Sequence, residues 1–146
     1  MDIIEKFSTI SEIINGLTDF VQNDEAVSAD FSEYLTTIGA GKDVSDEKIQ
    51  SICLPYIFER NIDSKSIIDI FLESKKKLTK GAKLILKALT NSTSSIFEVK
   101  KILKNGFEFY NLVNEKAYDV ISLVKMTHFR GVGIGQYVVA RIFELE

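Results

Sequence analysis

The sequence predicts an α+β fold in which helices come first and a small antiparallel β unit comes last. Apolar residues recur every three or four positions up to about residue 90, as they do in amphipathic helices. From Ser95 onward the period changes to two, and the residues become aromatic and β-branched. We therefore expect a bundle of about five helices over residues 1–93. A β region over residues 94–146 should complete one compact unit.

The first two predicted helices have the most regular apolar faces. In the first, the stripe alternates steps of four and three residues and contains Ile3, Phe7, Ile10, Ile14, Leu17 and Val21. Asp24 is expected to cap the second helix, which Gly39 and Gly41 should end. Its apolar face contains Val27, Phe31, Tyr34 and Ile38.

Three further helices are expected to begin at residues whose side-chain oxygens accept hydrogen bonds from the first turn. Ser45 is expected to cap the third helix, and Pro55 should kink or end it. Asp63 is expected to cap the fourth. Thr79 is expected to cap the fifth, which should run to about Leu89.

The β region contains the strongest local turn signal of the chain. The dipeptide Asn105-Gly106 predicts a type I′ turn between two strands, with Gly106 at a positive φ. A third strand is expected from Ala117 to Leu123, and the face of the last strand should carry Tyr137, Val139, Arg141 and Phe143.

Four strands joined by short turns predict a curled meander or an SH3-like partial barrel. The last strand stops at the end of the chain, where a barrel needs something to cover its edge. We therefore expect the sequence to be a fragment of a longer protein.

The composition is that of an ordinary globular chain, with 45% hydrophobic and 27% charged residues. The N-terminus carries Asp2 and Glu5 and has no long apolar run, so we expect neither a signal peptide nor a membrane span. The single cysteine, Cys53, has no partner for an internal disulfide, which favours a reducing compartment. We expect a soluble cytoplasmic protein.

Residue types that carry catalysis are scarce in this chain. Its one histidine, His128, lies on a polar stretch, whereas Cys53 lies on an apolar helix face, so the two are not expected to meet. A zinc site would need about four His or Cys ligands. The glycines Gly131, Gly133 and Gly135 lead into a strand and lack the spacing of a nucleotide-binding loop. We expect no enzyme, no catalytic residue, no cofactor and no metal.

The charge is distributed unevenly along the sequence. Residues 1–74 hold 5 Lys or Arg against 15 Asp or Glu, a net charge of −10. Residues 75–146 hold 13 against 6, a net charge of +7. Such asymmetry can indicate an anionic partner for the basic half, or two halves that simply balance each other.

The basic half contains one regular constellation. Its lysines at spacings of four, three and four occupy one face of the fifth predicted helix and its lead-in, and further basic residues of the β region could extend the patch. The candidate residues for an anionic partner are Lys76, Lys80, Lys83, Lys87, Lys100, Lys101, Lys104, Arg130 and Arg141. Exposed aromatic residues such as Phe109 or Tyr110 could stack on nucleic-acid bases. A solvated helix face explains the lysine row equally well.

Segments between about Leu54 and Glu144 follow a shared pattern: Tyr56–Arg60, Ser66–Leu72, Leu86–Leu89, Ser95–Val99, Gly106–Leu112, Tyr118–Val120 and Val139–Ile142. In this pattern the chain resembles a poorly characterised group of bacterial proteins, some of which carry a C-terminal SEC-C zinc motif. That motif is absent here, and Gly135-Gln136 stands where the group often has Gly-Asp. The resemblance therefore implies an architecture, without a zinc site or a SecA-type role.

Three function hypotheses remain open from the sequence. The first is a non-enzymatic module for protein–protein interaction or scaffolding, whose partner is another protein or a missing part of the same chain. The second is an RNA- or DNA-binding domain that uses the lysine row and the β unit. The third is an enzyme whose carboxylates cannot be paired from sequence.

Overall fold

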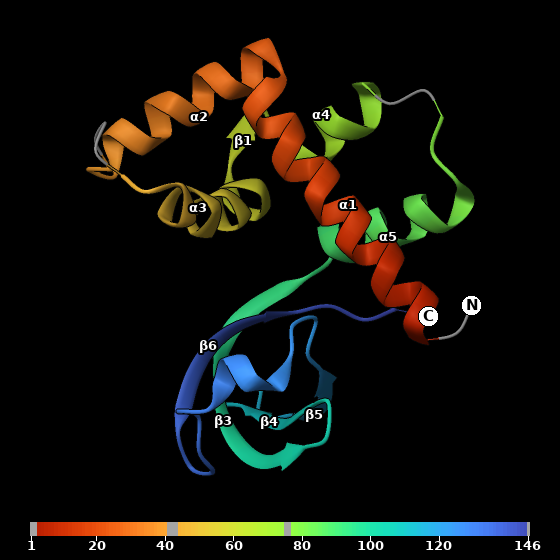
Figure 1. Cartoon of the computed structure of the whole chain (residues 1–146), viewed down its shortest axis with the longest axis vertical. Coiled ribbons are helices and arrows are strands. Elements are labelled where there is room, and N and C mark those ends of the chain that lie inside the picture. The colour runs from red at the N-terminus through yellow and green to blue at the C-terminus, as the bar shows by residue number, and fades with distance from the viewer. Residues whose placement is uncertain (1–2, 41–43, 75–76, 146) are drawn as a thin grey trace. The chain divides into compact units, whose positions relative to one another are not determined.

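The computed structural model describes residues 3–40, 44–74 and 77–145. Within them the predicted α+β fold is confirmed, with five α-helices ahead of a four-stranded antiparallel sheet (Figure 1). The chain divides into two compact units, a helical unit at Met1–Thr90 and a β unit at Asn91–Glu146. Every helix in the described ranges is too short or too polar to span a bilayer.

The helices of the helical unit begin close to where the sequence predicts. They are α1 (Ile3–Asn23), α2 (Glu25–Thr37), α3 (Asp46–Glu59), α4 (Ile67–Ser74) and α5 (Lys80–Thr90). The caps at Asp24, Ser45 and Thr79 are confirmed, because each side chain accepts a hydrogen bond from a first-turn N–H. Helix α3 continues through Pro55 and ends four residues later, at Glu59.

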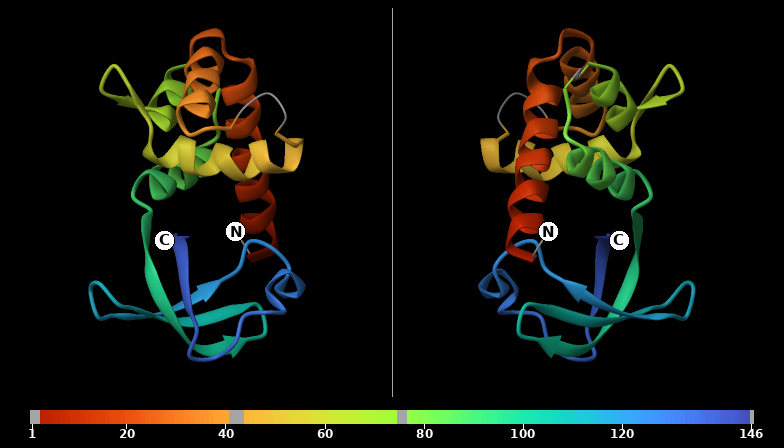
Figure 2. Two further views of the ribbon diagram at one scale, coloured as in Figure 1. Left: turned by 90° about the vertical axis from the view of Figure 1, so that its left-hand side faces the viewer. Right: turned by 90° about the vertical axis from the view of Figure 1, so that its right-hand side faces the viewer.

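A short hairpin between α3 and α4 was not predicted. Strand β1 (Asn61–Ile62) pairs with β2 (Lys65–Ser66), and Asp63 and Ser64 form the turn with φ of 50° and 68°. This hairpin projects from the helices of its unit (Figure 2, yellow-green). The prediction that Asp63 caps α4 is therefore wrong, because the hydroxyl of Ser66 accepts from the N–H of Asp69 at 3.1 Å.

The core of the helical unit combines aliphatic and aromatic side chains from all five helices. Tyr56 of α3 is fully buried, and its ring lies 4.8 Å from that of Phe31 and 5.2 Å from that of Tyr34, centroid to centroid. The other fully buried residues include Leu17, Val21, Val27, Cys53, Ile57, Ile67, Leu86 and Leu89. The predicted apolar helix faces thus supply this core, except for Ile38, which lies just past α2 and is 48% exposed.

The sheet of the β unit has the strand order β5-β4-β3-β6. Its strands are β3 (Thr93–Leu103), β4 (Gly106–Asn111), β5 (Ala117–Ile121) and β6 (Tyr137–Ile142). The first three form the expected meander, but β6 adds to the free side of β3. The sheet does not close into a barrel, so of the predicted arrangements the open antiparallel sheet is what the structure has. Strands β5 and β6 are its two edges.

The long strand β3 bends along its length (Figure 2). Its register with β4 shifts between Val99 and Lys101, which leaves Lys100 as an extra residue. Beyond this bulge, Lys101 pairs with Glu108 and is exposed. A bulge increases local twist, so β3 can pair with β6 along its first half and with β4 along its second.

The turn between β3 and β4 is displaced by one residue from the prediction. Leu103 pairs with Gly106, so the turn residues are Lys104 and Asn105. Neither these residues nor Gly106 has a positive φ, so the predicted type I′ turn is wrong. Gly106 is instead required by a close approach, because a Cβ there would lie 1.8 Å from the carbonyl oxygen of Val120.

The inner face of the sheet carries the core of the β unit. Phe97, Phe107 and Phe109 stack in series at centroid distances of 5.2 Å, and Phe129 meets Phe107 edge to face at 5.3 Å. Phe129 comes from a short 3-10 helix, η1 (Met126–Phe129). This aromatic cluster buries one face of the sheet and leaves the opposite face outward.

Candidate interaction surface

Three of the predicted basic residues lie on α5. Lys80, Lys83 and Lys87 are exposed, whereas Ile85 and Leu89 on the other side of the helix are buried. The sequence therefore identified the solvated face of α5 correctly. The fourth predicted member of the row, Lys76, lies outside the described residues.

The predicted basic residues of the β unit differ in how much of their charge is free for a partner. Lys101, Lys104 and Arg130 are exposed. Lys100 forms an ion pair with Glu98 on the outer face of the sheet. The hydrogen bond with Glu98 is the main cause that raises the pKa of Lys100. Arg141 donates a hydrogen bond to the hydroxyl of Ser92 at 3.0 Å.

The two aromatic rings proposed for base stacking already have contacts within the fold. Phe109 is buried in the aromatic cluster, so the expectation that it is exposed is wrong. Tyr110 is half-buried, and the ammonium of Lys100 lies 5.5 Å from the centroid of its ring. The basic set is also split between the two compact units, with Lys80, Lys83 and Lys87 in one and the others in the second.

The two residues considered for nucleophilic chemistry lie in different units. Cys53 is fully buried in the helical unit, and burial raises the pKa of its thiol to about 11. His128 is exposed on η1 in the β unit. Throughout the described ranges, no group of three or more His, Cys, Asp or Glu side chains gathers in an arrangement that could hold a metal ion.

The most strongly coupled polar group of the helical unit joins α2 to α3. The carboxylate of Asp30 accepts hydrogen bonds from Nε and Nη2 of Arg60, at 3.0 and 2.8 Å, and from the hydroxyl of Tyr56 at 2.7 Å. The hydrogen bond from Arg60 is the main cause that lowers the pKa of Asp30. Burial, followed by Asp30, raises the pKa of Tyr56. Because each group satisfies the others, we interpret this cluster as structural.

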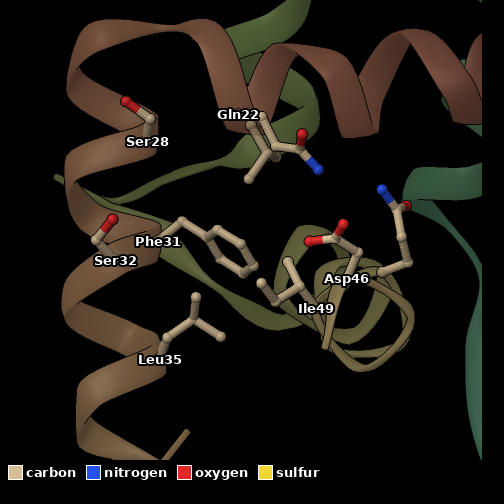
Figure 3. A pocket seen from close by; sticks show the side chains of 9 residues that line it. Gln22, Ser28, Phe31, Ser32, Leu35, Asp46 and Ile49 are labelled. Carbon is tan, nitrogen blue, oxygen red and sulfur yellow. The ribbon is translucent and has the colours of Figure 1, made fainter. Parts of the chain in front are cut away.

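A pocket of about 500 Å³ lies between α1, α2 and α3 (Figure 3). Phe31, Leu35 and Ile49 form its apolar wall, and Gln22 and Asp46 lie across from α2. Among the described residues that line it, Asp46 is the one ionisable residue, so this part of the lining lacks the convergent charged groups of a catalytic site.

Exposed apolar side chains are frequent in the β unit, both near β6 and near β5, where Ile121 is 55% exposed. Val113, Val139, Ile134 and Tyr137 are 77%, 76%, 69% and 66% exposed, the highest values among the large apolar residues whose burial the structure describes. Three of these four lie on β6 or the loop that leads into it. Val139 also pairs with Ile96 of β3, which is itself about half exposed.

The backbone of β6 presents hydrogen-bonding groups at the same edge. The N–H of Leu112, next to β4, donates to the carbonyl of Ile96, so the alternate residue Phe97 directs its backbone groups toward β6. Phe97 pairs with Val138. The N–H and C=O groups of Tyr137, Val139 and Arg141 therefore point away from β3.

The other edge strand, β5, has a different character. By the same alternation, the residues whose backbone groups point away from β4 are Ala117, Asp119 and Ile121. A charged residue in the middle of an edge strand opposes further pairing. β6 has an exposed valine at the corresponding position and contains neither proline, lysine nor a carboxylate.

Reasoning from sequence missed β6 as a candidate site, although the signal was present. The alternation correctly places Tyr137, Val139 and Arg141 on one face, and the uncovered edge of the last strand was recognised. What the sequence did not contain is the partner of β6, because pairing with β3 rather than β5 is a property of the whole sheet.

One protein-family model matches the chain over residues 1–144, and it describes a family of unknown function (DUF7986). No curated protein and no solved structure matches the chain significantly. This match confirms that the chain belongs to an uncharacterised family, which is the coarser part of the predicted resemblance.

Proposed function

This chain belongs to the family of unknown function DUF7986, and we propose that it is a non-enzymatic module for protein–protein interaction whose contact surface is the edge formed by β6. The residues assigned to this surface are Ile134, Tyr137 and Val139. No catalytic role or cofactor is assigned. A reducing compartment such as the cytoplasm suits a chain whose single thiol, Cys53, is buried and free.

The observation that carries this proposal is the coincidence of apolar side chains with outward-pointing backbone groups on β6. Isolated exposed apolar residues are common, but an edge strand that presents apolar side chains is a template for pairing with another chain. The one charged residue of β6, Arg141, lies near the end of the strand and donates a hydrogen bond to Ser92. Main-chain hydrogen bonds then supply affinity, and alternate side chains supply specificity. The edge of β6 meets both conditions at Tyr137 and Val139.

Photo-crosslinking in a native lysate tests the proposal. A p-benzoylphenylalanine in place of Tyr137 should give discrete crosslinked products, which mass spectrometry identifies. The same group in place of Val113, which is somewhat more exposed than Tyr137 and lies outside β6, is the control. The products from position 137 should disappear when Val139→Lys is added. Identical product patterns from positions 137 and 113 would overturn the proposal.

Nucleic-acid binding is a second candidate function, and the exposed row on α5 favours it. Lys80, Lys83 and Lys87 share one solvated face, which suits a phosphate backbone. Lys101, Lys104 and Arg130 of the β unit are exposed as well. This candidate requires no base-specific contact, because phosphate contacts alone support binding without sequence preference.

A further inference from the structure

We propose that the partner of β6 is a second copy of this chain, and that the two copies of β6 pair antiparallel across a two-fold axis at Val139. This inference rests on the proposed function, because it names the occupant of the same edge. The axis is perpendicular to the sheet, so the four strands of each copy join in one continuous sheet of eight. The outer faces of both copies then lie on the same side.

The register follows from the residues whose backbone groups point outward. In an antiparallel pair, directly opposed residues of this class exchange two hydrogen bonds. When the axis passes through Val139, this residue lies opposite Val139 of the second copy. Tyr137 then lies opposite Arg141 of the second copy. The three residues of each strand whose backbone groups point away from β3 are then all paired, which gives about six hydrogen bonds in total. Moving the axis toward either end of β6 leaves some of these residues without a partner.

The charge pattern of β6 complements itself in this register. Arg141 lies opposite the uncharged Tyr137 of the second copy, so no charged side chain of β6 meets a like charge. Shifting the axis to Arg141 would place two guanidinium groups directly opposite each other, which is unfavourable. The same symmetric pairing at β5 would place Asp119 opposite Asp119 of the second copy, so two carboxylates would meet. Self-complementarity therefore selects β6 and the register centred on Val139.

Sedimentation equilibrium of the purified full chain tests the self-association. The wild type should form dimers, and Val139→Lys should raise the dimer dissociation constant roughly tenfold or more, because two lysines would meet at the axis in place of two valines. Val113→Lys is the matched control, because Val113 is equally exposed and lies outside β6. It should leave the constant unchanged. Circular dichroism should show that both variants keep their fold.

Disulfide trapping tests the register. Val139→Cys should form an intermolecular disulfide on mild oxidation, because the Cα atoms of a directly opposed, hydrogen-bonded pair lie about 5.5 Å apart, which is within the range of disulfides. Tyr137→Cys alone should not, but a mixture of Tyr137→Cys and Arg141→Cys chains should form the mixed disulfide. The native Cys53 does not interfere, because it is fully buried.

The outcomes separate this inference from the proposed function. A wild-type chain that stays monomeric, or a dimer that Val139→Lys and Val113→Lys affect equally, overturns the self-association. If the crosslinks from position 137 then still depend on Val139 and identify a different protein, the interaction module stands with another partner. Disulfide formation by Tyr137→Cys alone, but not by Val139→Cys, overturns the register.

Discussion

Gly106 lies where β4 begins, and its missing side chain leaves room for the backbone of β5. A Cβ at this position would lie 1.8 Å from the oxygen and 2.8 Å from the carbonyl carbon of Val120. The sequence correctly indicated that glycine is needed near this turn, but it indicated the wrong reason. A dipeptide pattern reports local backbone preference, whereas the contact with Val120 depends on how β5 pairs with β4.

Gly106→Ala is expected to lower the free energy of unfolding by roughly 1–3 kcal/mol, the usual cost of overpacking, because the backbone of Val120 must shift. Gly106→Asn should cost at least as much, although asparagine tolerates a positive φ. Gly131→Ala is the control, because a Cβ there meets no atom within 4 Å. Urea denaturation measures all three. A well-tolerated Asn combined with a damaging Ala would restore the turn-strain explanation.

Asp30 provides a residue-scale test of electrostatics in the helical unit. Its folded-state pKa is lowered, first by the hydrogen bond from Arg60. Stabilisation of this kind is fully present above the unfolded pKa of about 4 and is lost as the pH falls through the lower folded value. The ion pair should therefore stabilise the unit at neutral pH and fail in acid.

Asp30→Asn is expected to destabilise the chain at pH 7 on the order of 1 kcal/mol, at the low end for charged hydrogen bonds because water still reaches part of the group. The difference in melting temperature between variant and wild type should shrink as the pH falls below about 4. Thermal melts across this range measure it. Glu12→Gln in the middle of α1 is the control, because Glu12 is exposed and lies outside the first turn of its helix. A difference that is independent of pH would contradict the assignment.

At the scale of elements, the sequence predicted helices best where the signals are local. The caps at Asp24, Ser45 and Thr79 depend on contacts within one turn, and all three are correct. Asp63 failed because a competing local structure, the β1–β2 turn, uses its tolerance of positive φ. The order of the strands could not be derived, since the residues that pair between β3 and β6 are about forty to fifty positions apart in sequence.

The cap of α4 can be tested by comparing Ser66 with Asp63. Ser66→Ala should cost about 0.5–2 kcal/mol, the range for removal of an N-cap, because the N–H of Asp69 loses its acceptor. Asp63→Gly should be neutral or stabilising, because glycine adopts a φ near 50° without strain. Chemical denaturation measures both changes. The opposite ranking would return the cap to Asp63.

At the scale of the whole molecule, the sequence shows that charges are segregated between its two halves. It does not show which charged side chains are available to a partner. The counts of −10 and +7 follow from composition alone. Tertiary contacts decide which basic side chains already have partners within the fold. Lys100, for example, pairs with Glu98, and Arg141 donates a hydrogen bond to Ser92. The row on α5 remains the part of the predicted basic site that a helical period could place correctly.

That row yields a quantitative prediction for nucleic acid. If it binds phosphates, labelled single-stranded RNA or DNA of mixed sequence should bind at about 50 mM salt, where screening is incomplete. The logarithm of the affinity should fall linearly with the logarithm of the salt concentration, with a slope of about −0.7 for each phosphate that the protein neutralises. Replacing Lys80, Lys83 and Lys87 by Gln should weaken binding and flatten the slope by about 0.7 for each phosphate that is no longer neutralised.

Fluorescence anisotropy measures both the affinity and the slope, and two controls make the result specific. Lys48→Gln removes one exposed charge from the acidic part of the chain and should change neither quantity. The triple variant should keep the melting temperature of the wild type, because its side chains point away from the buried Ile85 and Leu89. If no binding appears at low salt and high protein concentration, the lysine row is a solvated helix face. If Lys48→Gln lowers the logarithm of the affinity by about a third as much as the triple variant does, binding depends only on net charge, because one charge is removed instead of three.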